Sequence, residues 1–420
     1  MGDQTEVIVT SDASGLLWNI CIWDSRTGTA LMTYKGGGVP APNSVCFLGN
    51  DYVLAGEKSR PLIHAWPVNS QETLQQQLGR IVCPGCVTAL AISPTNRYCV
   101  AGINEKLYIW EVASGRLMAV ATRHYRTITC IRFTDDGSHF ASAGHDGMVL
   151  VWPLAYLISQ HTSELLVQSE AGQADPRYIF SDHSLPVGDL FIGHGGMRGR
   201  LLSVSGDRTC KIYDLASGVL LLSIVFDSAL CTVTMDPTET HVFIGAVSGA
   251  IHHFKLLNPP RTRDYHPSKE EIGDTFVGHS KAVTCLSTSL DGIRLLSGSS
   301  DETVILWDIQ SKLRIRTIQH KGPVTNAFFS LLPRQVFSDS FKPSILLQGF
   351  KKSLELNGDE LYTVVIMNKE KQEDEDCLDI SEANLSDTVD QKSSLEDEIL
   401  TLKKINHDLY KFAVEKVLHR

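Results

Sequence analysis

The stretch at 278–308 constrains the fold more than any other part of the chain, because short apolar runs alternate in it with tight-turn residues. The runs have strand length and lie at 283–289, 293–299 and 303–308. Each contains alternating or clustered apolar residues, which is typical of β-strands. Asp-Gly and Ser-Asp-Glu segments separate the runs and favour tight turns. We therefore expect three consecutive antiparallel strands in this stretch.

Two residue pairs frame the stretch, since Gly278-His279 opens it and Trp307-Asp308 closes it. This arrangement resembles the WD repeat, which has a period of roughly 40–45 residues and supplies four strands to each propeller blade. The resemblance implies an all-β fold built from such blades.

A chain of buried hydrogen bonds would explain why these residue types occur together. His279 can bond Asp301 in the turn, while Ser297 can link the imidazole to the Trp307 indole N–H. Buried polar groups must be paired, and a satisfied network holds the strands in one register. The same set recurs twice, which predicts three structural tetrads: His279, Ser297, Asp301 and Trp307; His124, Ser142, Asp146 and Trp152; His183, Ser203, Asp207 and Tyr213.

Strand-closing aromatic residues recur along the chain at blade-sized intervals. We take them as the anchors of seven blades: Trp23, Trp66, Trp110, Trp152, Tyr213, Phe254 and Trp307. Two intervals are longer than the others and require insertions. We expect a loop over 156–176 on blade four, where the sequence is polar and patternless. A second loop is expected over 257–272 on blade six, because its prolines cannot donate within a ladder.

The two ends of the propeller are expected to meet in blade one. The residues up to Trp23 leave room for only two strands, near 6–10 and 18–24, and a third strand follows near 29–34. A strand near 322–330 would then complete the blade, so that the propeller occupies 1–330. A ring closed in this way has no free edge.

The remaining residues divide into three segments. Residues 331–350 are apolar but broken by prolines, so we expect a packing extension over the propeller. Residues 351–392 are acidic and rich in serine, which predicts a disordered tether. An amphipathic α-helix is expected over 393–420, where a capping box precedes an a/d-type seam of Leu395, Leu402, Ile405, Leu409 and Phe412. This seam could dock on the propeller, on a partner or on a second copy.

Composition narrows the functional classes. The net charge is −10, but residues 351–400 hold 15 Asp and Glu against 5 Lys and Arg, so the body is near neutral and offers no basic footprint for nucleic acid. We expect neither a signal peptide nor a membrane span. The ten cysteines lie mostly in apolar runs and are expected to be buried in a reducing compartment.

No motif predicts an enzyme, a metal or a cofactor. The lone C-x-x-C at 83–86 lacks the second pair that a metal site needs and the setting of a redox pair. The histidines of the tetrads belong to different blades, so they should not converge. Glycine-rich 193–200, with the basic segments 261–263 and 58–60, leaves direct RNA binding open as an alternative function.

A second alternative comes from the segment Trp23-Asp24-Ser25-Arg26. It resembles the Trp-Asp-x-Arg motif by which some propellers dock onto a cullin ubiquitin-ligase adaptor, which would make the chain a substrate receptor. That motif has an aspartate six residues before the tryptophan, where this chain has Leu17.

Several segments extend the resemblance beyond the generic repeat. CIWDSRTG at 21–28, CPGCVTALAISP at 83–94, KGPVTNA at 321–327 and LKKINHDLYKF at 402–412 are similar to the WD-repeat propeller subunits of rixosome-type ribosome-maturation complexes. The resemblance implies a non-enzymatic scaffold of a nuclear complex for large ribosomal subunit maturation and removal of internal transcribed spacer RNA.

The same resemblance implies partners and a location. The partners would be a HEAT-repeat-like scaffold rich in proline, glutamate and leucine, a testis-expressed subunit, the midasin ATPase and the pre-ribosome. In fungal relatives the C-terminal helix pairs two propellers, which implies a homodimer. The chain is then expected in the nucleolus and nucleoplasm, with the cytoplasm left open.

Overall fold

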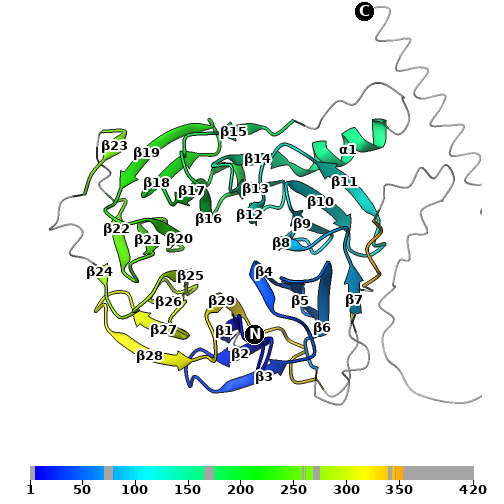
Figure 1. Cartoon of the computed structure of the whole chain (residues 1–420), viewed down its shortest axis with the longest axis horizontal. Coiled ribbons are helices and arrows are strands. Elements are labelled where there is room, and N and C mark those ends of the chain that lie inside the picture. Colours follow the sequence, from blue (N-terminus) through cyan, green and yellow to red (C-terminus); the bar gives the residue numbers. More distant parts are fainter. Residues whose placement is uncertain are drawn as a thin grey trace, which may run out of the picture. The chain divides into compact units, whose positions relative to one another are not determined.

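The strands of the chain form seven sheets arranged in a ring around a central axis (Figure 1). The computed structural model describes residues 5–70, 79–164, 175–257, 260, 262–267, 275–338, 343–345 and 347–352. This architecture is a seven-bladed β-propeller, so the predicted fold class is confirmed. The tether and helix expected over 351–392 and 393–420 lie outside the described residues, apart from residues 351 and 352.

Each blade is a small sheet whose first strand faces the axis. Blade one contains β29 (Val324–Leu331), β1 (Glu6–Asp12), β2 (Ile20–Asp24) and β3 (Ala30–Tyr34). Blade two contains β4 (Pro40–Leu48), β5 (Tyr52–Glu57), β6 (Leu62–Pro67) and β7 (Gly79–Val82). Blade three contains β8 (Val87–Ile92), β9 (Tyr98–Ile103), β10 (Lys106–Glu111) and β11 (Leu117–Ala121). Blade four contains β12 (Ile128–Phe133), β13 (His139–Gly144), β14 (Val149–Pro153) and β15 (Tyr178–Phe180).

The last three blades follow the same plan. Blade five contains β16 (Val187–Ile192), β17 (Arg200–Ser205), β18 (Thr209–Asp214), β19 (Val219–Val225) and the added β23 (Asp264–Tyr265). Blade six contains β20 (Leu230–Met235), β21 (His241–Ala246), β22 (Ile251–Lys255) and β24 (Thr275–Phe276). Blade seven contains β25 (Val283–Thr288), β26 (Arg294–Ser299), β27 (Thr303–Asp308) and β28 (Arg314–Gln319).

The seven aromatic anchors occupy equivalent places. Each lies on the third strand from the axis: β2, β6, β10, β14, β18, β22 and β27. Trp66, Trp110, Trp152 and Trp307 are almost completely buried. Their side chains join apolar clusters that mix residues of neighbouring blades. The blades therefore stay together because apolar area is removed from water between them.

Blade one is built from both ends of the chain. β29 pairs antiparallel with β1, with Val9 opposite Phe328 and Thr10 opposite Ala327. The Ser11 and Thr325 hydroxyls lie 2.8 Å apart across this pairing. β29 occupies the place where the sequence analysis expects a closing strand near 322–330. The ring is consequently closed by a pairing between residues more than 300 positions apart in sequence.

The two insertions differ from the expected loops. Helix α1 (Leu154–Glu164) occupies the first part of 156–176 and begins directly after β14. Leu154 and Leu157 are buried in the cluster between blades three and four, which stabilises a helix where polar residues suggested none. Within 257–272, Asp264 and Tyr265 form β23, which pairs parallel with the outer strand β19 of blade five. The insertion leaves blade six but adds a strand to its neighbour.

The chain continues after β29 as a strap, by which we mean the described residues of 332–352. Its central anchor is Asp51, a fully buried carboxylate in the turn between β4 and β5. Asp51 Oδ2 accepts hydrogen bonds from the Ser344 hydroxyl at 2.6 Å and from the Ser344 and Ile345 amides at 2.8 and 2.9 Å. Gln335 donates to the other oxygen at 3.1 Å. The strap thereby satisfies a buried charge that would otherwise be costly.

The end of the strap is fixed on blade three. Phe350 stacks on Trp110 with ring centroids 5.0 Å apart, and the Trp110 indole N–H donates to the Lys351 carbonyl oxygen at 2.9 Å. Gly115 lies beside the strap with a left-handed φ of 65°, and a Cβ there would lie 2.3 Å from the Gly349 carbonyl oxygen. The close approach of the strap thus requires glycine at 115.

We predict that Phe350→Ala lowers the free energy of unfolding by about 3 kcal/mol, because a stacked side chain that is 6% exposed is lost. Phe337→Ala is the matched control, since Phe337 lies on the same strap but is 65% exposed and should change stability by less than about 0.5 kcal/mol. Urea denaturation of both variants measures the difference. Equal effects would mean that the strap is not held by Phe350.

Candidate functional site

The predicted tetrad of blade seven forms a continuous chain of hydrogen bonds. His279 Nδ1 lies 3.0 Å from Asp301 Oδ2, and His279 Nε2 lies 2.7 Å from the Ser297 hydroxyl. The Trp307 indole N–H donates to the same hydroxyl oxygen at 2.8 Å. Because the Asp301 carboxylate can only accept, His279 Nδ1 carries the proton of the neutral imidazole and Nε2 accepts from the serine hydroxyl, so that every member of the chain is paired.

The other two tetrads repeat this geometry with one exception. In blade four the corresponding distances are 2.9 Å from His124 to Asp146, 2.8 Å from His124 to Ser142 and 2.9 Å from Trp152 to Ser142.

In blade five His183 lies 3.0 Å from Asp207 and 2.7 Å from Ser203. The Tyr213 hydroxyl, however, donates to Asp182 Oδ2 at 3.2 Å. A tyrosine at this position therefore extends the network to a neighbouring carboxylate.

A group of buried polar residues lies at the junction of the chain ends and escapes sequence reasoning. His320 is fully buried and lies 3.5 Å from Asp12, while the Trp23 indole N–H donates to the Thr10 hydroxyl at 2.8 Å. His320 precedes the first residue of β29 by four positions, as His279 precedes β25. This spacing was the available signal. The pairing of His320 with Asp12 was missed because Asp12 lies at the other end of the sequence.

Blade two replaces the tetrad with a different buried pair. Glu57 at the end of β5 and His64 on β6 are both buried, and the carboxylate lies 2.9 Å from His64 Nε2. Gly37 and Gly38 lie where other blades carry the histidine before the first strand. A Cβ at Gly37 would lie 2.6 Å from Trp66, and a Cβ at Gly38 would lie 2.2 Å from Glu57. The side chains of Trp66 and Glu57 therefore fill the space.

The surroundings of these networks lower the pKa of four aspartates and of His279. Burial alone would raise the pKa of Asp12, but the nearby His320 imidazole and hydrogen bonds from Ser14 and the Gly15 amide outweigh it and bring the pKa to about 2. For Asp146, Asp207 and Asp301 too, hydrogen bonds outweigh burial and lower the pKa. Burial lowers the pKa of His279, although Asp301 opposes the shift. These groups hold strands together and are turned away from solvent.

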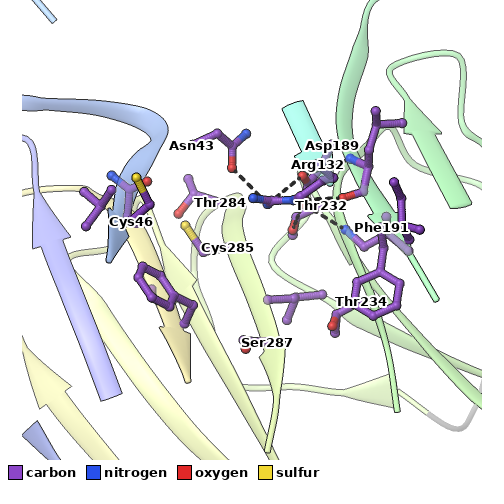
Figure 2. A pocket seen from close by; sticks show the side chains of 18 of the residues that line it. Asn43, Cys46, Arg132, Asp189, Phe191, Thr232, Thr234, Thr284, Cys285 and Ser287 are labelled. Atoms are coloured by element: carbon purple, nitrogen blue, oxygen red, sulfur yellow. Dashed lines mark hydrogen bonds and ion pairs between the residues drawn. The ribbon is translucent and has the colours of Figure 1, made fainter. Parts of the chain in front are cut away.

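The innermost strands line a central channel with a volume of about 440 Å³. Figure 2 shows Arg132 of β12 between Asn43 of β4 and Asp189 of β16. Arg132 Nη2 lies 3.3 Å from both Asn43 Oδ1 and Asp189 Oδ1. Cys46 and Cys285 also line the channel, and burial raises their pKa to about 12 and about 11. These thiols are therefore protonated at neutral pH and are poor nucleophiles.

The glycine-rich segment 193–200 has its amides occupied by carboxylates of neighbouring blades. The Gly195 and Gly196 amides donate to Asp135 at 2.8 and 2.6 Å, and the His194 amide donates to Glu239 at 2.8 Å. This segment contains the short 3₁₀ helix η2 (Gly196–Arg198) and joins blades four, five and six. Donors already bound to carboxylates are not free to hold a phosphate.

The other sequence candidates lie apart from one another. Cys83 and Cys86 are free thiols at the start of blade three; Cys83 is buried and burial raises its pKa to about 12. Trp23 lies on β2, and the exposed Arg26 follows in the turn to β3. Among the described residues no cluster of metal-ligating side chains occurs, and none of their helices is long and apolar enough to cross a membrane. Leu395, Leu402, Ile405, Leu409 and Phe412 lie outside the described residues.

The repeats and the tetrads define a class: this is a WD-repeat β-propeller. The model of the WD domain, G-beta repeat, matches residues 115–153 and 271–308.

Full-length relatives narrow the class further. The chain is 38% identical to WD repeat-containing protein 18 of Mus musculus and 39% identical to that of Homo sapiens, and each alignment covers 98% of both chains. The chain therefore belongs to the WD repeat-containing protein 18 family. It is also 28% identical to the pre-rRNA-processing protein pro-1 of Caenorhabditis elegans, over 75% of this chain and 59% of that protein.

We predict that Ser297→Ala lowers the free energy of unfolding by about 2–4 kcal/mol, because it leaves the His279 Nε2 atom and the Trp307 indole N–H without their buried partner. Ser280→Ala is the control, since Ser280 is exposed and only its backbone amide bonds Asp301. Denaturant unfolding of both variants measures the effect. A loss below about 1 kcal/mol for Ser297→Ala would contradict the role of the serine bridge.

We also predict that acid destabilises the propeller. The folded pKa of His279 lies below its ordinary 6.5, and those of Asp12, Asp146, Asp207 and Asp301 lie below their ordinary 3.8. The unfolded chain therefore binds more protons than the folded chain as the pH falls through these ranges, first near 6.5 and more strongly below 3.8. Urea midpoints measured between pH 7 and 3 should decrease steadily, whereas a constant midpoint would contradict these shifts.

Proposed function

We propose that this chain is a non-enzymatic scaffold subunit of a complex that processes pre-rRNA during maturation of the large ribosomal subunit. The observation that carries the proposal is the similarity to WD repeat-containing protein 18 over 98% of both chains. The similarity therefore extends over the C-terminal residues, which belong to no repeat. The name of the C. elegans relative, pre-rRNA-processing protein pro-1, indicates the process.

The surface of the propeller supports a scaffold role. Successive strands are antiparallel, so the turns between second and third strands lie on the same face as the connections between blades. That face exposes large apolar side chains at Leu16, Tyr125, Leu185 and Val277, with exposed fractions of 77, 78, 50 and 75%. Exposed apolar side chains of this kind are suited to protein partners.

The proposed partners follow the resemblance of the chain. They are a HEAT-repeat-like scaffold rich in proline, glutamate and leucine, a testis-expressed subunit, the midasin ATPase and the pre-ribosome. The proposed location is the nucleus, in both the nucleolus and the nucleoplasm. The proposed assembly is a homodimer held by the seam of residues 393–420, in which the second copy raises the effective concentration of every partner contact.

Leu402→Asp combined with Leu409→Asp should convert the full chain from a dimer to a folded monomer, because two charges would enter the apolar seam. Light scattering measures the mass, and circular dichroism checks the fold. His407→Asp with Lys411→Asp is the control, since these residues lie outside the seam and should leave the dimer intact.

In cells depleted of the protein, wild type should clear precursors that contain the internal transcribed spacer, and the monomeric variant should clear them less efficiently.

The two readouts separate the parts of the proposal. A wild-type chain that does not restore spacer removal would contradict the pre-rRNA function. A seam variant that remains a dimer would contradict only the helix as the contact. A wild-type monomer that restores processing would likewise exclude the homodimer while retaining the function.

A further inference from the structure

Blade six departs from the other blades at the end of its third strand. In four other blades this strand ends in an acidic residue: Asp24, Glu111, Asp214 and Asp308. Blade six instead has Lys255, which lies directly opposite His241 of β21. Two positions earlier, His253 lies opposite Phe243, where blades five and seven pair a leucine with an aliphatic residue. A lysine and two histidines thus replace acidic and aliphatic side chains.

These three basic side chains extend from one side of blade six. Residues that lie opposite each other, or two positions apart on one strand, share a face of the sheet, so His241, His253 and Lys255 are on the face of Phe243. Phe243 belongs to the apolar cluster between blades six and seven. The His253 ring stacks on Phe243 with centroids 4.9 Å apart. The basic side chains therefore face blade seven, which follows blade six around the ring (Figure 1).

Two turns of blade seven complete a hollow of about 480 Å³ around these side chains. The turn between β25 and β26 contributes Gly292 and Ile293, and the turn between β27 and β28 contributes Ile309, Gln310 and Lys312. The described residues that line the hollow include two lysines and two histidines, and none of them is acidic or an arginine. The hollow is therefore a basic site with an apolar wall.

The acidic residues of the two turns lie outside the hollow. Asp308 shares a face with Leu296, which belongs to the cluster between blades seven and one, so its carboxylate faces away from blade six. Asp291 accepts a hydrogen bond from the Ile293 amide at 2.9 Å and is held in its own turn. Lys255 is exposed, and within the described part of the chain it makes no ion pair. Its ammonium group can therefore bind an incoming anion.

The two imidazoles can adapt to the charge of a ligand. His241 Nδ1 lies 2.8 Å from His253 Nε2, so one ring donates a hydrogen bond to the other. A neutral pair of this kind can take up a further proton, and an anion nearby favours the protonated form. The pair then adds positive charge to the hollow when an anion is bound.

We propose that this hollow binds a phosphoserine or phosphothreonine side chain of a partner protein. A phosphate monoester carries a charge of about −1.5 to −2 at pH 7 and three acceptor oxygens that point in different directions. Ammonium and imidazole groups arriving from two blades suit such a group. A planar carboxylate is recognised best by the fork of a guanidinium, which the described lining does not offer. The inference goes beyond the proposed function and does not depend on it.

The form of the hollow favours a phosphopeptide over RNA. RNA binding draws most of its affinity from several phosphates along a strand. Here the basic side chains gather in one hollow between two blades, which suits a single dianionic group. Ile293 is 54% exposed in the wall and can contact an apolar residue beside the phosphorylated one.

Degenerate peptide libraries with one fixed central residue, applied to the immobilised full-length chain, test the proposal. The fixed residue is phosphoserine in one library, serine in the second and glutamate in the third. The phosphoserine library should be retained and should yield a common sequence, whereas the serine and glutamate libraries should not be retained. Equal retention of the three libraries, or no retention of the phosphoserine library, would overturn the proposal.

Labelled copies of the selected phosphopeptides then locate the site by fluorescence anisotropy. Lys255→Glu should weaken binding about tenfold or more, because it removes a charge-assisted hydrogen bond and places a carboxylate beside the phosphate. Lys281→Glu is the matched control, since Lys281 is exposed on the connection between blades six and seven, at the opposite face, and gives the same change in net charge. Equal binding by the two variants would contradict a site at Lys255.

Ile293→Trp provides a test that does not change the charge, because a tryptophan there would fill the hollow. It should abolish phosphopeptide binding. Leu290→Trp is its control, since Leu290 belongs to the same turn and is 61% exposed but does not line the hollow. A labelled single-stranded RNA of mixed sequence that binds more tightly than every phosphopeptide, and loses affinity in Lys255→Glu, would show an RNA site and overturn the proposal.

Discussion

The pairing of β29 with β1 is the constraint on which the rest of the molecule depends. Without it, blade one would lack its innermost strand, and two sheet edges would be open to solvent. The same pairing brings His320 to Asp12 and places the start of the strap beside the N-terminal residues, where the Leu332 amide donates to the Thr5 carbonyl oxygen at 2.9 Å. It also positions Asn326, which accepts a hydrogen bond from the Ser44 amide of β4 beside the central channel. Closure therefore organises both the stability of the ring and the shape of its central cavity.

The tetrads and the strap stabilise the ring in complementary ways. Each tetrad fixes the register of strands within a blade by pairing groups that would be costly to bury alone. The strap instead links blades, since it satisfies Asp51 in blade two and covers Trp110 in blade three. The strap contacts turns of one face, at Asp51 between β4 and β5 and at Gly115 between β10 and β11, whereas the exposed Leu16, Tyr125, Leu185 and Val277 lie on the opposite face. This is the physical basis for proposing a scaffold, because rigid faces can bind several proteins without rearranging.

The sequence predicts the repeating parts of this structure well. Trp152 and Trp307 predict blades because a large apolar side chain must be buried on the third strand of each blade, whatever the surrounding loops. Features formed by distant residues are harder to predict. His320 and Asp12 are separated by nearly the whole propeller. The bulge between Pro40 and Val45 of β4 becomes visible only when these residues are paired with Glu57 and Ala55 of β5. Helix α1 was missed because buried Leu154 and Leu157 precede an otherwise polar stretch. The helix expected over 393–420 stays a prediction.

Hydrogen exchange of the full-length chain under increasing denaturant tests the central role of closure most directly. If the pairing of β29 with β1 holds the whole ring, the amides of both strands should exchange only through global unfolding, with the same free energy as the buried strands of blade four. Exchange of the β29 amides through a separate opening of much lower free energy, while the other blades stay protected, would contradict the account.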